Sequence, residues 1–269
     1  MASGSALRLL LKHARETVDE CLPSNVSRED LNNHTLDGKL SEVLFAVSSA
    51  GHGSSKSIDL SWEDKADIWH VVCKLWNSCV DTFSPSSQCP RWMVTLRQHA
   101  SDILELVKDS ELSSEERAVK LSIYHRTGVA HAEAGGYEAA EAAFSRAHEQ
   151  CMRLMKDLEN AGISESQLCE LSTSSVDLLL DRLVNAWKLQ QTDLASDLLS
   201  QASELTSQAR MPSRQRFLMC RQVVITCLNR GQQCLAAKDP DAIELLKQAY
   251  KLITEHLALD DDDDSFEMF

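Results

Sequence analysis

The stretch that decides the fold spans residues 127–147 and reads TGVAHAEAGGYEAAEAAFSRA. Gly135 and Gly136 interrupt two runs of helix-forming residues and are typical of the turn between two antiparallel helices. On the second helix, Phe144 shares one face with an alanine four residues before it and another three residues after it. Small residues let two helix backbones approach closely, and Gly128 on the first helix leaves room that Phe144 fills. We therefore expect a tightly packed helical hairpin.

This stretch is similar to a tetratricopeptide repeat (TPR), a helical hairpin with a characteristic order of small and large residues. The positions that match the repeat are Gly128, Tyr137, Ala140, Phe144 and Ala147. Repeats of this kind stack into a right-handed superhelix that binds other proteins and carries out no chemistry. The resemblance therefore implies that the function of this chain depends on a protein partner.

The spacing of small, large and small residues returns twice further along the chain. The later copies are Ala195, Leu199 and Ala202, and then Ala242, Leu246 and Ala249. The three copies are separated by 55 and then 47 residues, whereas a regular repeat has about 34. Gly231 lies near the place that Gly128 has in the first copy, displaced by one residue. We predict an all-α fold, a TPR-like solenoid of helical hairpins with degenerate repeats.

The composition favours a helical protein and argues against several functions. The 269 residues include only nine glycines and five prolines. A formal net charge of −14 argues against direct binding of nucleic acid, because such a surface needs clustered Lys and Arg. The apolar runs are shorter than the roughly 20 residues of a membrane span, and the run at residues 6–11 is too short for a signal peptide. We expect an intracellular protein that contacts neither nucleic acid nor membrane directly.

No group of residues in the sequence indicates a catalytic, cofactor or metal site. The nine cysteines contain no Cys-x-x-Cys pair, and three of them recur every seven residues, as core residues of one helical face do. The loop at residues 48–57 resembles a phosphate-binding loop, but Ser55 stands where such loops have a glycine. We expect no enzyme activity, cofactor or metal; an enzyme would have to use scattered histidines. The three cysteines that recur every seven residues are Cys220, Cys227 and Cys234. The scattered histidines are His99, His125, His131 and His148.

Three parts of the chain differ in composition. Residues 1–60 contain N-terminal helices and a flexible Ser/Gly loop, residues 61–259 form the repeat domain, and residues 260–269 are an acidic, disordered tail. The predicted helices cover residues 5–21, 37–47, 61–80, 90–109, 113–134, 137–160, 165–190, 192–209, 213–237 and 240–258.

The helix that begins near Ser61 has two further features. Ser61 and Asp64 form a capping signal at its start. Trp62, Trp69 and Trp76 recur every seven residues and therefore share one face. We expect this tryptophan face to pack against a neighbouring helix, and a peptide-binding ridge is the alternative.

The order of several segments carries a second resemblance. These segments are Ile68–Asn77, the repeat Gly128–Ala147, Ala186–Leu189 with the second copy, and Asn229–Tyr250. In this order they resemble the meiotic crossover scaffold family, which comprises the Zip-four and Spo-twenty-two proteins of fungi and plants and the Tex-eleven protein of mammals. The resemblance implies a superhelical scaffold in the nucleus that links crossover factors to the axis of meiotic chromosomes, and so promotes recombination and synapsis. The chain departs from the family in length, because family members are several times longer.

In repeat arrays the first helix of each hairpin lines the binding groove. The candidate partner-binding residues are therefore Tyr124, His131, Asn185 and Lys188, whose polar atoms we expect to be exposed. A general TPR adaptor or cochaperone in the cytoplasm is the alternative function. The carboxylate clamp of such cochaperones needs lysine and asparagine where this chain has His125 and Val129.

The last predicted helix carries two apolar faces. One face contains Ile243, Leu246, Tyr250, Ile253 and Leu257, and the other contains Leu245, Ala249, Leu252 and Leu259. The terminal helix of a solenoid needs only one buried face. We therefore expect the chain to expose an apolar patch and to self-associate through residues 245–259.

Overall fold

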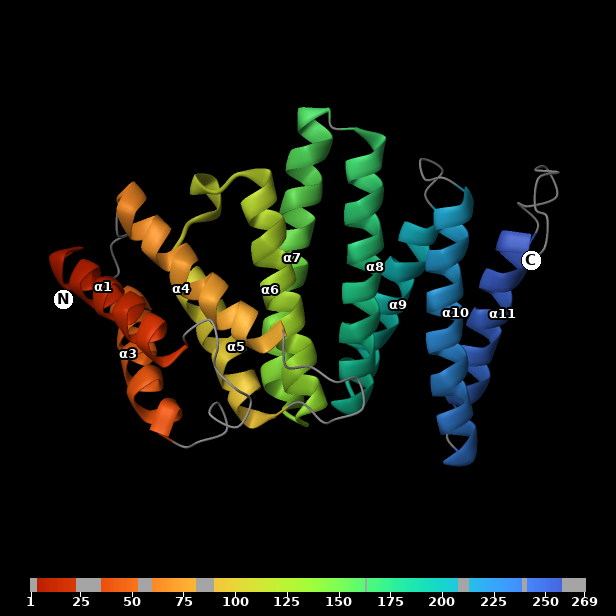
Figure 1. Cartoon of the computed structure of the whole chain (residues 1–269). Helices are drawn as coiled ribbons and strands as arrows, with labels where there is room; N and C mark the ends of the chain where they lie inside the picture. Colours follow the sequence, from red (N-terminus) through yellow and green to blue (C-terminus); the bar gives the residue numbers. More distant parts are fainter. Residues whose placement is uncertain are drawn as a thin grey trace. The chain divides into compact units, whose positions relative to one another are not determined.

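The computed structural model describes residues 4–22, 35–52, 60–80, 90–162, 164–207, 213–238 and 241–257. Within these ranges the chain forms ten α-helices and one short 3₁₀ helix, and no β-strand (Figure 1). The prediction of an all-α fold is therefore confirmed. The predicted acidic tail and residues 53–57 of the predicted Ser/Gly loop lie outside the described residues, whereas residues 48–52 of that loop are helical, so the prediction was wrong there.

The chain divides into two compact units, residues 1–150 and 151–269, and the division falls within α7. The elements up to α7 are α1 (Gly4–Cys21), α3 (Thr35–His52), α4 (Trp62–Val80), α5 (Arg91–Leu104), η1 (Asp109–Glu111), α6 (Ser114–Glu133) and α7 (Tyr137–Ala161). The elements that follow are α8 (Glu165–Lys188), α9 (Thr192–Thr206), α10 (Ser213–Ala236) and α11 (Asp241–Leu257).

Most of these helices match the predicted ranges within a few residues, with two differences. The predicted helix at residues 90–109 ends at Leu104, because the backbone turns there and enters η1. The predicted helix at residues 37–47 continues to His52, since Ser48, Ser49 and Ala50 contain no helix-breaking residue.

The first unit has one apolar core, to which α1, α3, α4, α5 and α6 all contribute. Trp69 and Trp76 pack against this core, as we expected, but Trp62 is 76% exposed and this part of the prediction was wrong. Trp62 is the first residue of α4. Its side chain therefore lies at the end of the tryptophan face, beyond the packed part of the helix.

Side-chain pairs connect α1 with α4. The Arg8 guanidinium lies 3.1 Å from the Asp64 carboxylate, and Nε2 of His70 lies 2.9 Å from that of Asp19. Asp64 also accepts a hydrogen bond from the backbone N–H of Ser61, while Ser61 Oγ accepts one from the Asp64 N–H. The predicted capping signal is thus confirmed as a capping box.

The three hairpins α6–α7, α8–α9 and α10–α11 share a positive φ at the turn. The second residue after the first helix has a positive φ in each: 81° at Gly135, 58° at Gln190 and 58° at Lys238. In the first two hairpins the next N–H, of Gly136 or Gln191, donates to a carbonyl five residues earlier, at 2.8 and 3.0 Å. This arrangement is a Schellman motif, which ends a helix and reverses the chain.

The three small–large–small sets occupy buried positions on the second helix of each hairpin. Eight of the nine residues are buried, and Leu246 is half-buried. Tyr137, at the start of α7, is also half-buried. The buried residues are Ala140, Phe144, Ala147, Ala195, Leu199, Ala202, Ala242 and Ala249.

A glycine on the first helix faces the large residue of the second in two hairpins. A Cβ atom at Gly128 would lie 2.5 Å from the Phe144 ring, and one at Gly231 would lie 3.1 Å from the Leu246 side chain. Gly128 and Gly231 each precede the residue of positive φ by seven positions. Gly231 therefore has the same position relative to its turn as Gly128 has. The offset of one residue between the two copies arises in the second helix, where the small–large–small set begins one residue closer to the turn.

Three cysteines on α10 are core residues, as predicted. Cys220, Cys227 and Cys234 are all buried and pack with α8, α9 and α11 residues in one apolar cluster. Burial raises the pKa of the Cys227 thiol to about 11. This thiol is therefore protonated and unreactive at neutral pH.

Gly128→Ala should destabilise the α6–α7 hairpin, although alanine is the better helix former. The new methyl group would overlap the buried Phe144 ring, and such overpacking costs about 1–3 kcal/mol. The thermal midpoint, followed by circular dichroism, should fall. Gly38→Ala is the matched control, because a Cβ at this position of α3 meets nothing within 4 Å. That change should stabilise the protein by up to about 1 kcal/mol. Equal effects of the two changes would contradict the close packing, and Phe144→Ala should remove the penalty at Gly128.

Candidate partner-binding site

The structure separates the four candidate partner-binding residues into two buried and two accessible ones. Tyr124 and Asn185 are each only 1% exposed, so the expectation that they present polar atoms to a partner was wrong. His131 is half-buried near the end of α6, and Lys188 is exposed at the end of α8. Only His131 and Lys188 therefore stay available as contact residues.

Tyr124 is buried because two cations and a carboxylate enclose it. Lys120 Nζ lies 5.9 Å from the centre of its ring, and the Arg146 guanidinium lies 5.6 Å from it. Burial and the hydrogen bond with Glu105 raise the pKa of its phenol well above the usual range. Cation–π contacts of this kind are stronger when they are shielded from water. These contacts therefore hold Tyr124 inside the fold, where its phenol is not presented at the surface.

Ion pairs connect α6 and α7 to the segment around η1. Lys120 Nζ donates to Asp109 Oδ1 and to the Val107 carbonyl, both at 2.9 Å. Arg146, on α7, donates to Glu105 at 3.3 Å, and Gln150 donates to Asp109. Because these partners lie up to 41 residues apart in the chain, no local pattern in the sequence predicts them.

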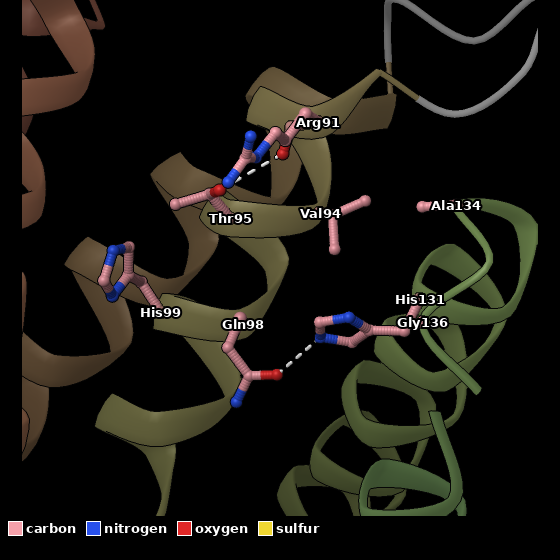
Figure 2. A pocket seen from close by; sticks show the side chains of 8 residues that line it. All are labelled: Arg91, Val94, Thr95, Gln98, His99, His131, Ala134 and Gly136. Atoms are coloured by element: carbon pink, nitrogen blue, oxygen red, sulfur yellow. Dashed lines mark hydrogen bonds between the residues drawn. The ribbon is translucent and has the colours of Figure 1, made fainter. Parts of the chain in front are cut away.

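A hollow of about 510 Å³ lies between α5 and the turn of the α6–α7 hairpin. Figure 2 shows Gln98 on α5 and His131 on α6 pointing toward each other across it. Apolar Val94 and Ala134 also line the hollow. The remaining lining residues are Arg91, Thr95, His99 and Gly136.

A short chain of hydrogen bonds orients His131. Its Nε2 donates to Oε1 of Gln98 at 2.7 Å, and Gln98 Nε2 donates to Asp102 Oδ1 at 2.6 Å. Burial lowers the pKa of His131; nearby Asp102 opposes this shift, and Arg146 adds to it. The imidazole is therefore neutral at physiological pH; its one N–H donates to Gln98, and Nδ1 is left as an acceptor.

This arrangement suits recognition better than catalysis. A catalytic triad needs a carboxylate in direct contact with the histidine and a nucleophile on its other nitrogen. Here the Gln98 amide separates His131 from Asp102, and an amide does not relay a proton as a carboxylate does. A partner side chain that packs on Val94 and hydrogen-bonds to His131 fits the hollow.

The described residues contain no group of three or more His, Cys, Asp or Glu that could hold a metal ion. Among the described helices, none is both long and apolar enough to cross a membrane.

Comparisons with known proteins do not identify a family for this chain. Neither a protein-family model nor a curated protein matches the chain. Among solved structures, a chain from "Computational Design of Self-Assembling Cyclic Protein Homooligomers" matches 97% of this chain and 98% of its own length. Its sequence identity is 10% and its TM-score is 0.25, so the similarity bears on neither fold nor function.

The stability of the protein should fall as the pH drops below about 6.5, the ordinary pKa of histidine. Because the fold lowers the pKa of His131, the unfolded chain binds more protons than the folded one in this range. The contribution of the neutral His131 to the free energy of unfolding is thus fully present above this pH. It is lost as the pH falls through the pKa that His131 has in the folded protein. His131→Gln, which does not titrate, should reduce this dependence in thermal unfolding between about pH 5 and 7.5. His13→Gln, on the exposed side of α1, is the control. Identical pH profiles for both variants would show that His131 is not held neutral.

Proposed function

We propose that this chain is a non-enzymatic protein–protein interaction scaffold built from TPR-like helical hairpins. The observation that carries the proposal is the repetition within α6–α7, α8–α9 and α10–α11. These hairpins share a positive φ at the turn and a small–large–small set on the second helix. Repeated hairpins of this kind stack into a right-handed superhelix and present surfaces for partner proteins.

The accessible polar residues of the first helices support this proposal. His131 faces a hollow with both apolar and hydrogen-bonding walls, and Lys188 is exposed next to the turn of the second hairpin. Mixed walls of this type bind peptide side chains, because apolar contacts supply affinity and a few polar groups fix orientation. Both residues lie within one helical turn or so of a hairpin turn.

We further propose that the scaffold acts in meiosis, in the nucleus, at chromosomes. The resemblance of residues 62–258 to the meiotic crossover scaffold family supports this role. The partners would be crossover factors and proteins of the chromosome axis, and the scaffold would link them without contacting DNA or membrane itself. The alternative is a general TPR adaptor or cochaperone in the cytoplasm.

Affinity capture should distinguish the two roles. We expect the full chain, immobilised and exposed to matched meiotic and mitotic extracts, to enrich crossover and axis proteins from the meiotic extract only. A variant with His131→Ala and Lys188→Ala should retain its helicity and capture these proteins less well, because both changed side chains are accessible. Arg126→Ala, also exposed on α6, should capture them normally. Enrichment of chaperones from both extracts would favour the cochaperone and would reject the meiotic role.

The chain should also self-associate through α11. Leu245, Ala249 and Leu252 are buried, so one of the two predicted apolar faces of α11 is not available for self-association. The exposed apolar patch lies on the other face, where Ile243 and Tyr250 are exposed. Tyr250, which is 70% exposed, leaves a large apolar area in water. Analytical ultracentrifugation over a range of concentrations should show association that Tyr250→Asp weakens. Gln222→Asp, exposed on α10, adds the same charge and should not weaken it. A monomer at every concentration would contradict this expectation.

A further inference from the structure

A second hollow, of about 360 Å³, lies within the second unit, beside the turn of the α8–α9 hairpin and against α10 and α11. Its floor is apolar and includes Leu199 and Leu245. Gln191, at the turn, and Gln248, on α11, bring side-chain amides to its rim. The hollow therefore combines an apolar floor with hydrogen-bonding groups at the edge, as peptide-binding pockets do.

Arg230, on α10, is the unusual residue of this hollow. Its guanidinium carbon lies 5.7 Å from the centre of the Trp187 ring, and this stacking holds the side chain in place. Its Nε–H is buried and has no hydrogen-bond acceptor. Among the described residues, Arg230 forms no ion pair, whereas Arg146 pairs with Glu105. The protein covers Nε, so a ligand in the hollow would pair with the terminal amino groups of the guanidinium, whose charge no carboxylate among the described residues pairs.

The charges around Arg230 select the kind of acceptor. A carboxylate fits best, because the planar guanidinium fork binds its two oxygens through parallel hydrogen bonds. Glu244 also lines the hollow, and the chain carries a net charge of −14, so the dense charge of a polyanion such as nucleic acid is disfavoured more than the single charge of one carboxylate. A cationic ligand is disfavoured too, since Arg230 already covers the face of Trp187.

We propose that this hollow binds a partner segment in which an aspartate or glutamate side chain adjoins an apolar residue. The carboxylate pairs with Arg230, the apolar side chain packs on Leu199 and Leu245, and Gln191 and Gln248 hydrogen-bond to the backbone of the segment. This inference rests on the proposed scaffold function and names the chemistry of one of its ligands.

Peptide binding to the full chain, labelled with ¹⁵N, tests the proposal by NMR. The probe is a mixture of pentapeptides, N-acetylated and C-amidated, with a central glutamate flanked by varied apolar residues. A second mixture has glutamine at the centre, and a third lacks acidic side chains but keeps a free C-terminal carboxylate. The Nε–H signal of Arg230 is assigned from its absence in Arg230→Gln.

We expect the glutamate mixture to shift the Arg230 signal in a saturable manner, and the glutamine mixture to shift it little. Arg230→Gln should weaken binding about tenfold or more, since a hydrogen-bonded charge is lost. Arg221→Gln, exposed on the same helix, should bind normally. Arg230→Lys keeps the charge but loses the fork and should bind with intermediate affinity. Circular dichroism of each variant checks that α10 is intact.

Three outcomes would overturn the proposal: equal binding of the glutamate and glutamine mixtures, binding of the third mixture alone, or no binding to the folded wild-type chain. The last outcome would leave the scaffold function standing if the wild-type chain still captures meiotic proteins. Conversely, saturable binding of the glutamate mixture without such capture would reject the meiotic role and keep the peptide site.

Discussion

The close approach of two helices within a hairpin is the constraint on which the repeated part of the structure depends. At Gly128 a side chain as small as a methyl group would collide with Phe144, so the two helix axes can lie close together only if this position has no Cβ. The same contact joins Gly231 and Leu246 less tightly. In the α6–α7 hairpin the Schellman turn lies seven residues after Gly128 and fixes which residues of the two helices can meet. The turn and the contact between the glycine and the large residue together determine how the two helices pack. The large residue can be aliphatic, as Leu246 is.

Features that depend on nearby residues were predictable from the sequence. The capping residues Ser61 and Asp64 lie three apart, and their hydrogen bonds are local, so the start of α4 could be read directly. The turn at Gly135 was equally clear, because glycine adopts a positive φ without strain. Gln190 and Lys238 adopt the same conformation without this signal. The repeated spacing of small and large residues revealed those two hairpins, although their turn residues did not.

The exposure of individual polar side chains was not predictable in the same way. Tyr124 lies on the first helix of a hairpin, where TPR arrays usually present residues to a partner, yet it is buried. The cause is Arg146 and Glu105, which come from α7 and from the residue after α5, and which only the folded chain brings together. Periodicity identifies the face of a helix on which a residue lies, but neighbours distant in the sequence decide whether water reaches that face.

The two hollows differ in the chemistry of the residues that line them. Each lies beside a Schellman turn, and each is lined by a polar or aromatic residue from the last turn of the first helix: His131 in one, Trp187 in the other. Trp187 also packs against the apolar cluster of the second unit. The first carries a neutral histidine oriented through Gln98, and the second an arginine held on an indole ring. The remaining ring nitrogen of His131 is a neutral acceptor and favours an uncharged donor, whereas a half-buried guanidinium favours a carboxylate. Two hairpins with the same turn therefore carry chemically distinct hollows.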